Sequence, residues 1–273
     1  MKVLMKRISL AALLVVLSGA ASAAEAQEQP ATPDCVEKTY SLTAGAEVAT
    51  HVCGEYQTVT AYIPANSSAL TVQDIRKKST AKQAYAPVAN KNTILIASGG
   101  FFGFRSDGVE KPIGLIRSNG KRLVKLMEWD HGGILVSDRR GNVKIIPAQN
   151  RNQAGAWPEA IQSKPIILYK GTIDIHKNPR DAEFNRVAIG YTLEGDMLVV
   201  GVFHSFSQAS TLYDFAQTFK DIADSRGLKI HRALALDGGA GAQIHIPSKG
   251  LLFGDSGRSY FPNAVRIDRL AEK

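Results

Sequence analysis

The chain has 273 residues, with 33 basic and 25 acidic side chains and a formal net charge of +8. The basic residues are scattered and form no block of five or six, so the charge suits an anionic substrate or an envelope surface and does not indicate a nucleic-acid partner. The sequence contains no internal repeat and no linker-like or low-complexity stretch after residue 35, which favours one domain with a sizeable core.

The first residues have the features of a secretory signal peptide. Three basic residues precede an apolar run over 8–20, and the small residues at 21–23 have the arrangement that signal peptidase reads. An uncleaved membrane anchor is disfavoured, because the run is short and no second apolar span follows it. We therefore expect a cleaved signal at 1–23, a periplasmic or secreted protein and no transmembrane anchor. Cleavage leaves 30 basic and 25 acidic residues, a net charge of +5.

The chain contains two cysteines, Cys35 and Cys53. An oxidising compartment favours a disulfide between them, worth roughly 3 kcal/mol by the loop-entropy estimate. The alternative is a pair of unrelated reduced thiols. Two cysteines without a matching pair of histidines do not indicate a zinc site, and we expect no metal and no cofactor. A loose polar lead-in over 24–34 and one folded domain over 35–273 complete the predicted organisation.

Strand patterns dominate the rest of the chain. Residues 58–63 alternate and are rich in β-formers, and residues 93–97 form a short apolar run. Three further pairs of apolar runs flank turn residues that contain glycine, which is typical of β-hairpins. The paired runs are 113–116 with 123–126, 134–136 with 143–146, and 187–192 with 197–203.

Two segments have helical character. Residues 71–85 form a polar candidate. A clearer helix runs from about Leu212 to Arg226, can be capped by Ser210 or Thr211, carries an apolar stripe at helical spacing and ends at Gly227. Antiparallel hairpins with few helices predict an α+β fold in a single domain.

Two apolar strands end on glycines, at Ser98-Gly99-Gly100 and at Asp237-Gly238-Gly239. Glycine lets the backbone turn sharply and lets a ligand approach the amides. An acid at a strand end beside exposed N–H groups suits a catalytic carboxylate. The alternative for each segment is an ordinary strand-exit turn.

Two polar side chains join these candidates. Arg186 begins an apolar strand, where its guanidinium can bind a phosphate through two parallel hydrogen bonds. A surface arginine is the alternative. Gln162 offers amide hydrogen bonds to a substrate.

Five motifs in order resemble the phosphodiester glycosidase family. The resemblance spans roughly residues 90–247 and implies curved, mostly antiparallel sheets with a few helices, and hydrolysis of sugar-1-phosphodiesters. The motifs are Gly-Gly-Phe-Phe (99–102), Pro-x-Gly (112–114), Gln-Ser-x-Pro (162–165) with a later Gly171, Arg-x-Ala-Ile-Gly (186–190), and, after the helix, Leu-Asp-Gly-Gly (236–239).

The resemblance implies a site of Ser98, Gly99 and Gly100 with Arg186 and with Asp237, Gly238 and Gly239. Two positions depart from the family pattern. Ser98 stands where the family usually has Asn, and residues 240–243 replace small hydroxyl residues. These departures motivate an alternative function, a non-catalytic protein of the envelope that binds a glycan or a sugar phosphate.

The chemistry can also be argued from the residues. Ordinary glycosidases use two carboxylates, one of which protonates the leaving oxygen. A phosphate leaving group is a weak base with a second pKa of about 6, so it needs charge neutralisation more than a proton. Asp237 as nucleophile or base and Arg186 as phosphate clamp fit hydrolysis of a sugar-1-phosphodiester in a phosphorylated glycan.

Two other patterns carry less weight. Gly254-Asp255-Ser256-Gly257 together with His51 resembles a trypsin-like protease, but Arg258 stands where those enzymes need glycine. The remaining histidines show no metal-ligand spacing, and the two that lie just beyond candidate strands are His204 and His245. The full set is His131, His176, His204, His231 and His245.

Overall fold

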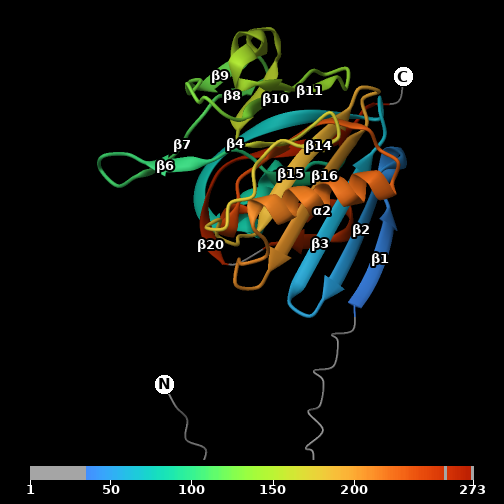
Figure 1. The fold of residues 1–273 in the computed structure, drawn as a ribbon. Coiled ribbons are helices and arrows are strands. Elements are labelled where there is room, and N and C mark those ends of the chain that lie inside the picture. Colours follow the sequence, from blue (N-terminus) through green and yellow to red (C-terminus); the bar gives the residue numbers. More distant parts are fainter. Residues whose placement is uncertain (1–34, 255–256, 272–273) are drawn as a thin grey trace, which may run out of the picture. The chain divides into compact units, whose positions relative to one another are not determined.

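Strands are the main regular element of the described structure, and the ladders between them are antiparallel (Figure 1). The computed structural model describes residues 35–254 and 257–271, and it confirms the predicted α+β class with mostly antiparallel sheets. The predicted signal at 1–23, the lead-in at 24–34, and Asp255 and Ser256 lie outside the described residues.

The largest sheet has eight strands. It begins with a three-stranded meander and continues with the hairpin predicted for 187–203. In spatial order its strands are β1 (Cys35–Ser41), β2 (Glu47–Cys53), β3 (Tyr56–Ile63), β16 (Met197–His204), β15 (Arg186–Thr192), β17 (Ile230–Ala235), β13 (Ile166–Tyr169) and β14 (Thr172–Ile173).

Two five-stranded sheets and one hairpin are the other strand pairings in the part of the chain that the structure describes. One sheet contains β11 (Val143–Pro147), β10 (Gly133–Ser137), β12 (Glu159–Ser163), β8 (Ile116–Ser118) and β9 (Lys121–Val124), in that order. The other contains β19 (Leu251–Phe253), β18 (Ile244–Ile246), β5 (Thr93–Ser98), β20 (Arg258–Arg269) and β4 (Ser68–Thr80). The hairpin pairs β6 (Phe102–Phe104) with β7 (Glu110–Pro112).

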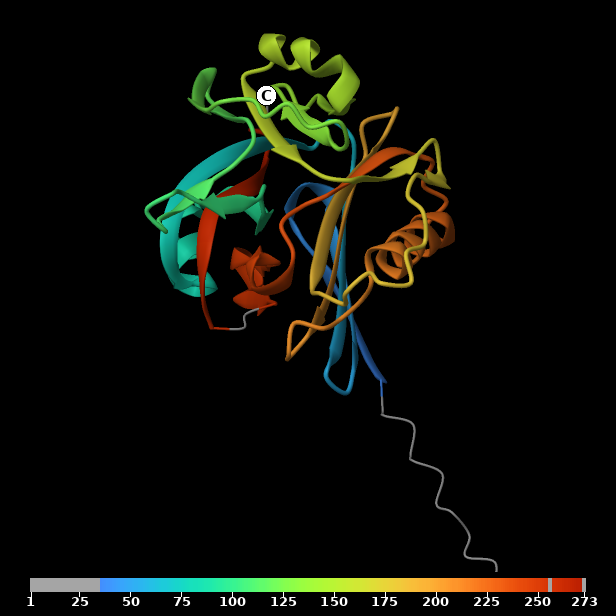
Figure 2. The same ribbon diagram turned by 60° about the vertical axis from the view of Figure 1, so that its left-hand side comes forward.

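Both faces of the central strands of the eight-stranded sheet are buried, which explains why these strands read as continuous apolar runs. On β15, Val187 and Ile189 belong to the large core that the sheet shares with the two five-stranded sheets. Ala188 between them belongs to a second core, on the face that packs against a helix. Figure 2 shows the helix on one side of this sheet and the long strands β4 and β20 on the other.

The helix is α2 (Leu212–Ser225), as the sequence predicted. Its first turn is capped by Thr211, whose hydroxyl accepts from the backbone N–H of Asp214 at 3.2 Å. Phe219 is fully buried against the sheet beside Gly190, where a Cβ would lie only 2.9 Å from the Phe219 ring. Glycine in this strand therefore allows the aromatic side chain to lie directly on the backbone.

The polar helix predicted for 71–85 is wrong over most of its length. Residues through Thr80 belong to β4, and only α1 (Ala81–Tyr85) is helical, starting from a capping box at Thr80. The long strand is stabilised by pairing with β20, in which Val72 lies opposite Val265. This partner is distant in sequence, so local periodicity gives no sign of it. Within the described residues, 3-10 helices cover Thr43–Gly45, Ala86–Val88, Ala148–Ala156, Gly239–Gly241 and Pro247–Lys249.

The two predicted hairpins around 120 and 140 are present with shifted ends. Asn119 and Gly120 form the turn between β8 and β9, both with positive φ, as an Asn-Gly hairpin requires. The second hairpin joins β10 and β11.

The predicted disulfide is also present. It joins Cys35 at the start of β1 to Cys53 at the end of β2, which are directly opposite in the antiparallel register. None of the helices in residues 35–254 and 257–271 has the length and apolar character needed to cross a bilayer.

Candidate active site

The ends of β5 and β17 meet where the two sheets come together. The backbone N–H of Asp237 donates to the carbonyl oxygen of Gly99 at 2.8 Å. The Ser98 hydroxyl donates to the carbonyl oxygen of Asp237 at 3.3 Å. These bonds bring side by side the two glycine segments that the sequence indicated separately.

Glycine is required at this junction because the neighbouring groups occupy the space of a side chain. A Cβ on Gly99 would overlap the amide oxygen of Asn263, and one on Gly100 would lie 2.7 Å from the carbonyl oxygen of Gln162. On the other segment, a Cβ on Gly241 would overlap the carboxylate of Asp237. The glycines therefore let the two segments pack directly against β20, β12 and the Asp237 carboxylate.

A pocket of about 300 Å³ opens beside Asp237. Its described lining includes one carboxyl group and two basic side chains, so its charge is positive whether or not the carboxyl group is ionised. The polar and aromatic lining consists of Phe101, Lys164, Phe184, Arg186, Asp237 and the backbone of Gly238 and Gly239.

Asp237 has an unusual environment for a carboxyl group. It follows the apolar strand β17, is 7% exposed, and accepts a hydrogen bond from the Gly238 N–H at 3.1 Å. Burial raises the pKa of Asp237 to about 7, and the Gly238 bond opposes that rise only in part. The group can therefore change its protonation state near neutral pH, as a general acid or base does.

Arg186 enters the same pocket from the start of β15. Its Nε donates to the carbonyl oxygen of Ser210 at 3.3 Å, and Nη2 donates to that of Ala182 at 2.9 Å. Asp181 lies 3.7 Å from Nη2. Burial lowers the pKa of Arg186 and the charge of Asp181 opposes this, yet an arginine stays cationic in proteins. The structure thus anchors one side of the guanidinium.

The glycine turn lies against this arginine. A Cβ on Gly238 would be 4.0 Å from Cδ of Arg186 and 3.1 Å from the carbonyl oxygen of Asn185. The Gly239 N–H donates to that same carbonyl at 2.8 Å. Arg186 and the Asp-Gly-Gly turn are therefore held together by the backbone.

Four of the predicted site residues are not part of the described lining of the pocket. The Ser98 hydroxyl and the Gly99 carbonyl both bond to the Asp237 backbone, whereas the Gly100 N–H donates to Asn263. The Gln162 side chain bonds to the main chain, accepting from the N–H groups of Leu115 and Met127 and donating to the Met127 carbonyl at 2.8 Å. The Gln162 side chain therefore links the two segments that contain Leu115 and Met127. The contact of Gln162 with substrate stays a prediction.

The structure adds residues that the sequence analysis missed. Asn263 on β20 accepts from the Gly100 N–H at 2.6 Å, and its Nδ2 has no hydrogen-bond partner within the described chain. Tyr85 is fully buried, and burial together with the charge of Asp237 raises its pKa well above the ordinary value. Nothing local distinguishes Asn263, because β20 also contains Ser259, Arg266 and Asp268 among its apolar residues.

Lys164 is a further cation of the pocket that the sequence did not indicate, although it lies within the Gln-Ser-x-Pro motif (162–165). It lines the pocket and its Nζ lies 5.0 Å from the centre of the Trp129 ring. Trp129 in turn packs edge-on against Phe101, with ring centres 6.4 Å apart. The lysine is thereby held over an aromatic ring beside the pocket.

The two histidines near the candidate strands do not line this pocket. His204 lies 3.2 Å from the carboxylate of Glu55, and its Nδ1 accepts from the Phe206 N–H. Burial lowers the pKa of His245, whose Nδ1 has no hydrogen-bond partner in the described residues. The structure also gives no support to the protease-like pattern, because His51 lies on β2, where its ring contacts the Cys53 sulfur.

Comparisons with known proteins agree with the fold and the motif order. The family model for phosphodiester glycosidases matches residues 91–264, more than half of the chain. The chain belongs to the phosphodiester glycosidase family.

Solved structures give the same fold at low identity. The catalytic domain of zebrafish N-acetylglucosamine-1-phosphodiester alpha-N-acetylglucosaminidase, auto-inhibited by its pro-peptide, is 15% identical with a TM-score of 0.57, over 89% of this chain and 85% of that one. A hypothetical protein from Synechocystis is 12% identical with a TM-score of 0.57, over 86% of this chain and 64% of that one. The search of curated proteins gave no match.

The raised pKa of Asp237 predicts a specific dependence of stability on pH. Its pKa of about 7 in the folded state exceeds the unfolded value of about 3.9, so the group favours folding most at low pH, and this contribution is lost as pH rises to about 7. Asp237→Asn removes the charge. The free energy of unfolding of the variant minus that of wild type should therefore increase by on the order of 4 kcal/mol between pH 4 and pH 8.

Urea denaturation of both proteins across this pH range measures the difference. Asp107→Asn is the matched control, because that carboxylate is 47% exposed and should give a much smaller change. A difference for Asp237→Asn that stays constant with pH contradicts the assigned pKa.

Proposed function

We propose that the protein is an exported hydrolase that cleaves the glycosyl bond of a sugar-1-phosphodiester in a phosphorylated envelope or extracellular glycan. The proposal rests on the pocket, where one carboxyl group stands with two cations. A glycosidase with an ordinary leaving group needs a second carboxyl group as acid. A phosphate monoester leaves as a stabilised anion, so cations can replace that acid.

Asp237 acts at the anomeric carbon of the sugar. Its position is fixed by the end of β17 and by the Gly99 carbonyl, and the glycines beside it leave room for substrate. The ionised carboxylate either attacks the carbon or takes a proton from the attacking water. Both roles require the charged form, so kcat/KM should rise with pH through about 7.

Arg186 and Lys164 bind the phosphate. The Nη1 group of Arg186 makes no hydrogen bond within the described chain, and the bonds from Nε and Nη2 to carbonyl oxygens orient the planar fork. Two cations stabilise the extra charge that develops on the leaving phosphate. Asp181, near Nη2, offsets part of the arginine charge but does not line the pocket.

The remainder of the substrate has space on the same surface. Phe101 and Phe184 give the pocket two aromatic walls suited to the apolar face of a sugar ring, and the Arg186 Cζ lies 5.2 Å from the centre of the Phe184 ring. A second pocket of about 520 Å³, which includes His176 and Arg232, shares Pro165 with the first. It can accept the next units of a glycan.

A periplasmic or secreted location fits the Cys35–Cys53 disulfide, since such bonds persist in oxidising compartments. The alternative function, a non-catalytic glycan- or sugar-phosphate-binding protein, is motivated by Ser98 and by residues 240–243. In the structure Ser98 and Gly241 both contact Asp237, so these departures lie beside the proposed carboxylate.

Turnover of sugar-1-phosphodiesters tests the proposal. Asp237→Asn keeps the shape and the acceptor for the Gly238 N–H but removes the charge. We expect kcat to fall at least about 100-fold, equivalent to roughly 3 kcal/mol, with KM little changed. The assay is release of free sugar from a panel of sugar-1-phosphodiesters, with the melting temperature measured on the same samples.

Asp107→Asn, in the β6–β7 turn, is the matched control and should keep wild-type turnover. Near-normal turnover by folded Asp237→Asn removes the carboxylate from the mechanism. Tight binding of the panel by wild type without any release of sugar would instead support the binding protein.

Replacement of the arginine tests phosphate recognition. Arg186→Lys keeps a positive charge but loses the planar fork, so kcat/KM for a phosphodiester should fall at least tenfold. An uncharged aryl glycoside of the same sugar should be affected much less, because it offers no phosphate. Equal losses on the two substrates, with an unchanged melting temperature, would exclude a phosphate clamp at this position.

A further inference from the structure

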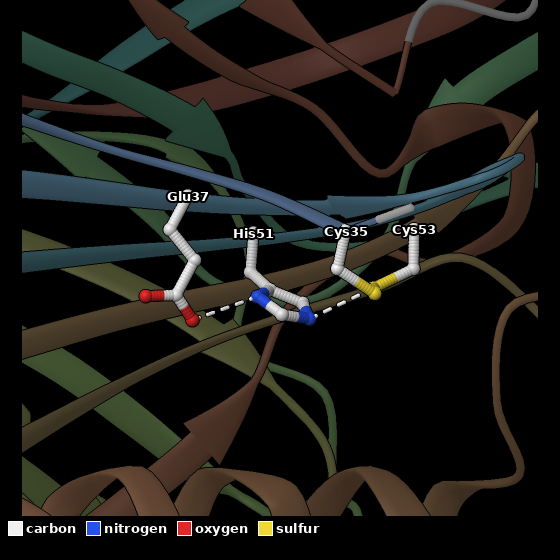
Figure 3. The surroundings of a disulfide bond; sticks show 4 residues. All are labelled: Cys35, Glu37, His51 and Cys53. Atoms are coloured by element: carbon white, nitrogen blue, oxygen red, sulfur yellow. Dashed lines mark hydrogen bonds and ion pairs between the residues drawn. A yellow bond between two sulfur atoms is a disulfide. The ribbon is translucent and has the colours of Figure 1, made fainter. Parts of the chain in front are cut away.

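Four side chains with metal-binding or acid–base character gather at the edge of the eight-stranded sheet, on β1 and β2 (Figure 3). In the antiparallel register Cys35 lies opposite Cys53 and Glu37 lies opposite His51. Cys35 and Glu37 are two residues apart on β1, and His51 and Cys53 are two residues apart on β2. Because side chains alternate between the faces of a strand, all four point to the same face of the sheet.

The histidine bridges the disulfide and the carboxylate. Its Nε2 lies 2.9 Å from Sγ of Cys53, and its Nδ1 lies 2.9 Å from Oε1 of Glu37. The ligand atoms of Cys35, His51 and Cys53 all lie within 4.8 Å of one another. The side chains of His51 and Glu37 are 46% and 79% exposed, so solvent and ions reach them.

We propose that reduction of the Cys35–Cys53 disulfide converts this cluster into a Zn²⁺ site. The ligands are the sulfur atoms of Cys35 and Cys53 and Nε2 of His51, with the fourth position left to water. The site and the disulfide are mutually exclusive states of the same hairpin. The proposal is independent of the hydrolase activity, because the cluster shares no residue with the pocket at Asp237.

The sequence did not indicate zinc, since it offers two cysteines and no matching pair of histidines. The register of β1 with β2 supplies the missing ligand, because it places one histidine beside both sulfur atoms. Two thiolates and one neutral imidazole form a ligand set suited to Zn²⁺, and the two negative charges balance the ion.

The distances suit zinc after a small adjustment. Zn–S bonds of about 2.3 Å and Zn–N bonds of about 2.0 Å place tetrahedral ligand atoms roughly 3.5–3.8 Å apart. Glu37 provides the outer support that zinc-bound histidines usually have, because a carboxylate that accepts from Nδ1–H leaves the Nε2 lone pair free for the metal. A groove of about 490 Å³ between α2 and β1–β3 includes both His51 and Glu37 and gives an ion a path to the site.

The chemical steps balance with a dithiol as the reductant. The dithiol gives two electrons and two protons, the S–S bond breaks, and the reductant leaves as its own disulfide. Each cysteine then carries one S–H group. Binding of Zn²⁺ displaces both thiol protons to solvent and forms two Zn–S bonds and one Zn–N bond.

Cobalt binding to the folded chain tests the site. The mature protein is reduced with dithiol, desalted under nitrogen and titrated with Co²⁺ alone, and the near-ultraviolet thiolate-to-cobalt absorption is recorded. We expect one Co²⁺ per reduced chain, displaced by Zn²⁺, and no such absorption from the oxidised protein. Glu37→Gln should weaken binding about 10- to 100-fold through loss of the outer hydrogen bond.

His51→Ala separates this site from a simple pair of thiols. The residue is exposed, so the variant should fold, and its Co²⁺ affinity should fall at least tenfold, whereas the control His176→Ala should match wild type. Circular dichroism of each reduced sample checks the fold. Absence of the thiolate absorption in reduced wild type, or equal affinity in His51→Ala and wild type, would overturn the proposal.

Discussion

The hydrogen bond from the Asp237 N–H to the Gly99 carbonyl is the contact on which the candidate site depends. It joins the end of a strand in the eight-stranded sheet to the end of a strand in a five-stranded sheet. Around this bond, Gly99, Gly100 and Gly241 leave space for Asn263, Gln162 and the Asp237 carboxylate, respectively. A side chain at Gly99 or Gly100 would push the end of β5 away from β20 or β12. A side chain at Gly241 would displace the Asp237 carboxylate directly, so either change would disturb the position of Asp237 beside the pocket.

The same junction explains why Asp237 is chemically unusual. The core that continues past β17 excludes water from the carboxyl group, and a single N–H from Gly238 provides only part of the solvation that water would give. The folded protein therefore holds the carboxyl group with a pKa of about 7, at a cost in stability at higher pH. Buried carboxyl groups with raised pKa values are typical of catalytic positions, and here a pocket with two cations lies beside one.

Local sequence signals predicted the parts of the structure that are formed locally. The capped helix α2, the Asn-Gly hairpin and the strand that leads to Asp237 follow from spacing and turn chemistry over a few residues. The error at β4 has the opposite cause, since that strand depends on a partner almost at the end of the chain. The sequence did not indicate Lys164 as a pocket cation for the same reason. Lys164 lies between β12 and β13, and no residue near it in the sequence shows that it lines the same pocket as Arg186.

Hydrolysis in ¹⁸O-labelled water tests the proposed chemistry most directly. The protein is incubated with a sugar-1-phosphodiester and the phosphate-containing product is analysed by mass spectrometry. If Asp237 directs attack at the anomeric carbon, the glycosyl C–O bond breaks, so the phosphomonoester must be released without ¹⁸O and the label must enter the sugar. Incorporation of ¹⁸O into the phosphomonoester would mean that water attacks phosphorus, and it would contradict a glycosidase acting through Asp237.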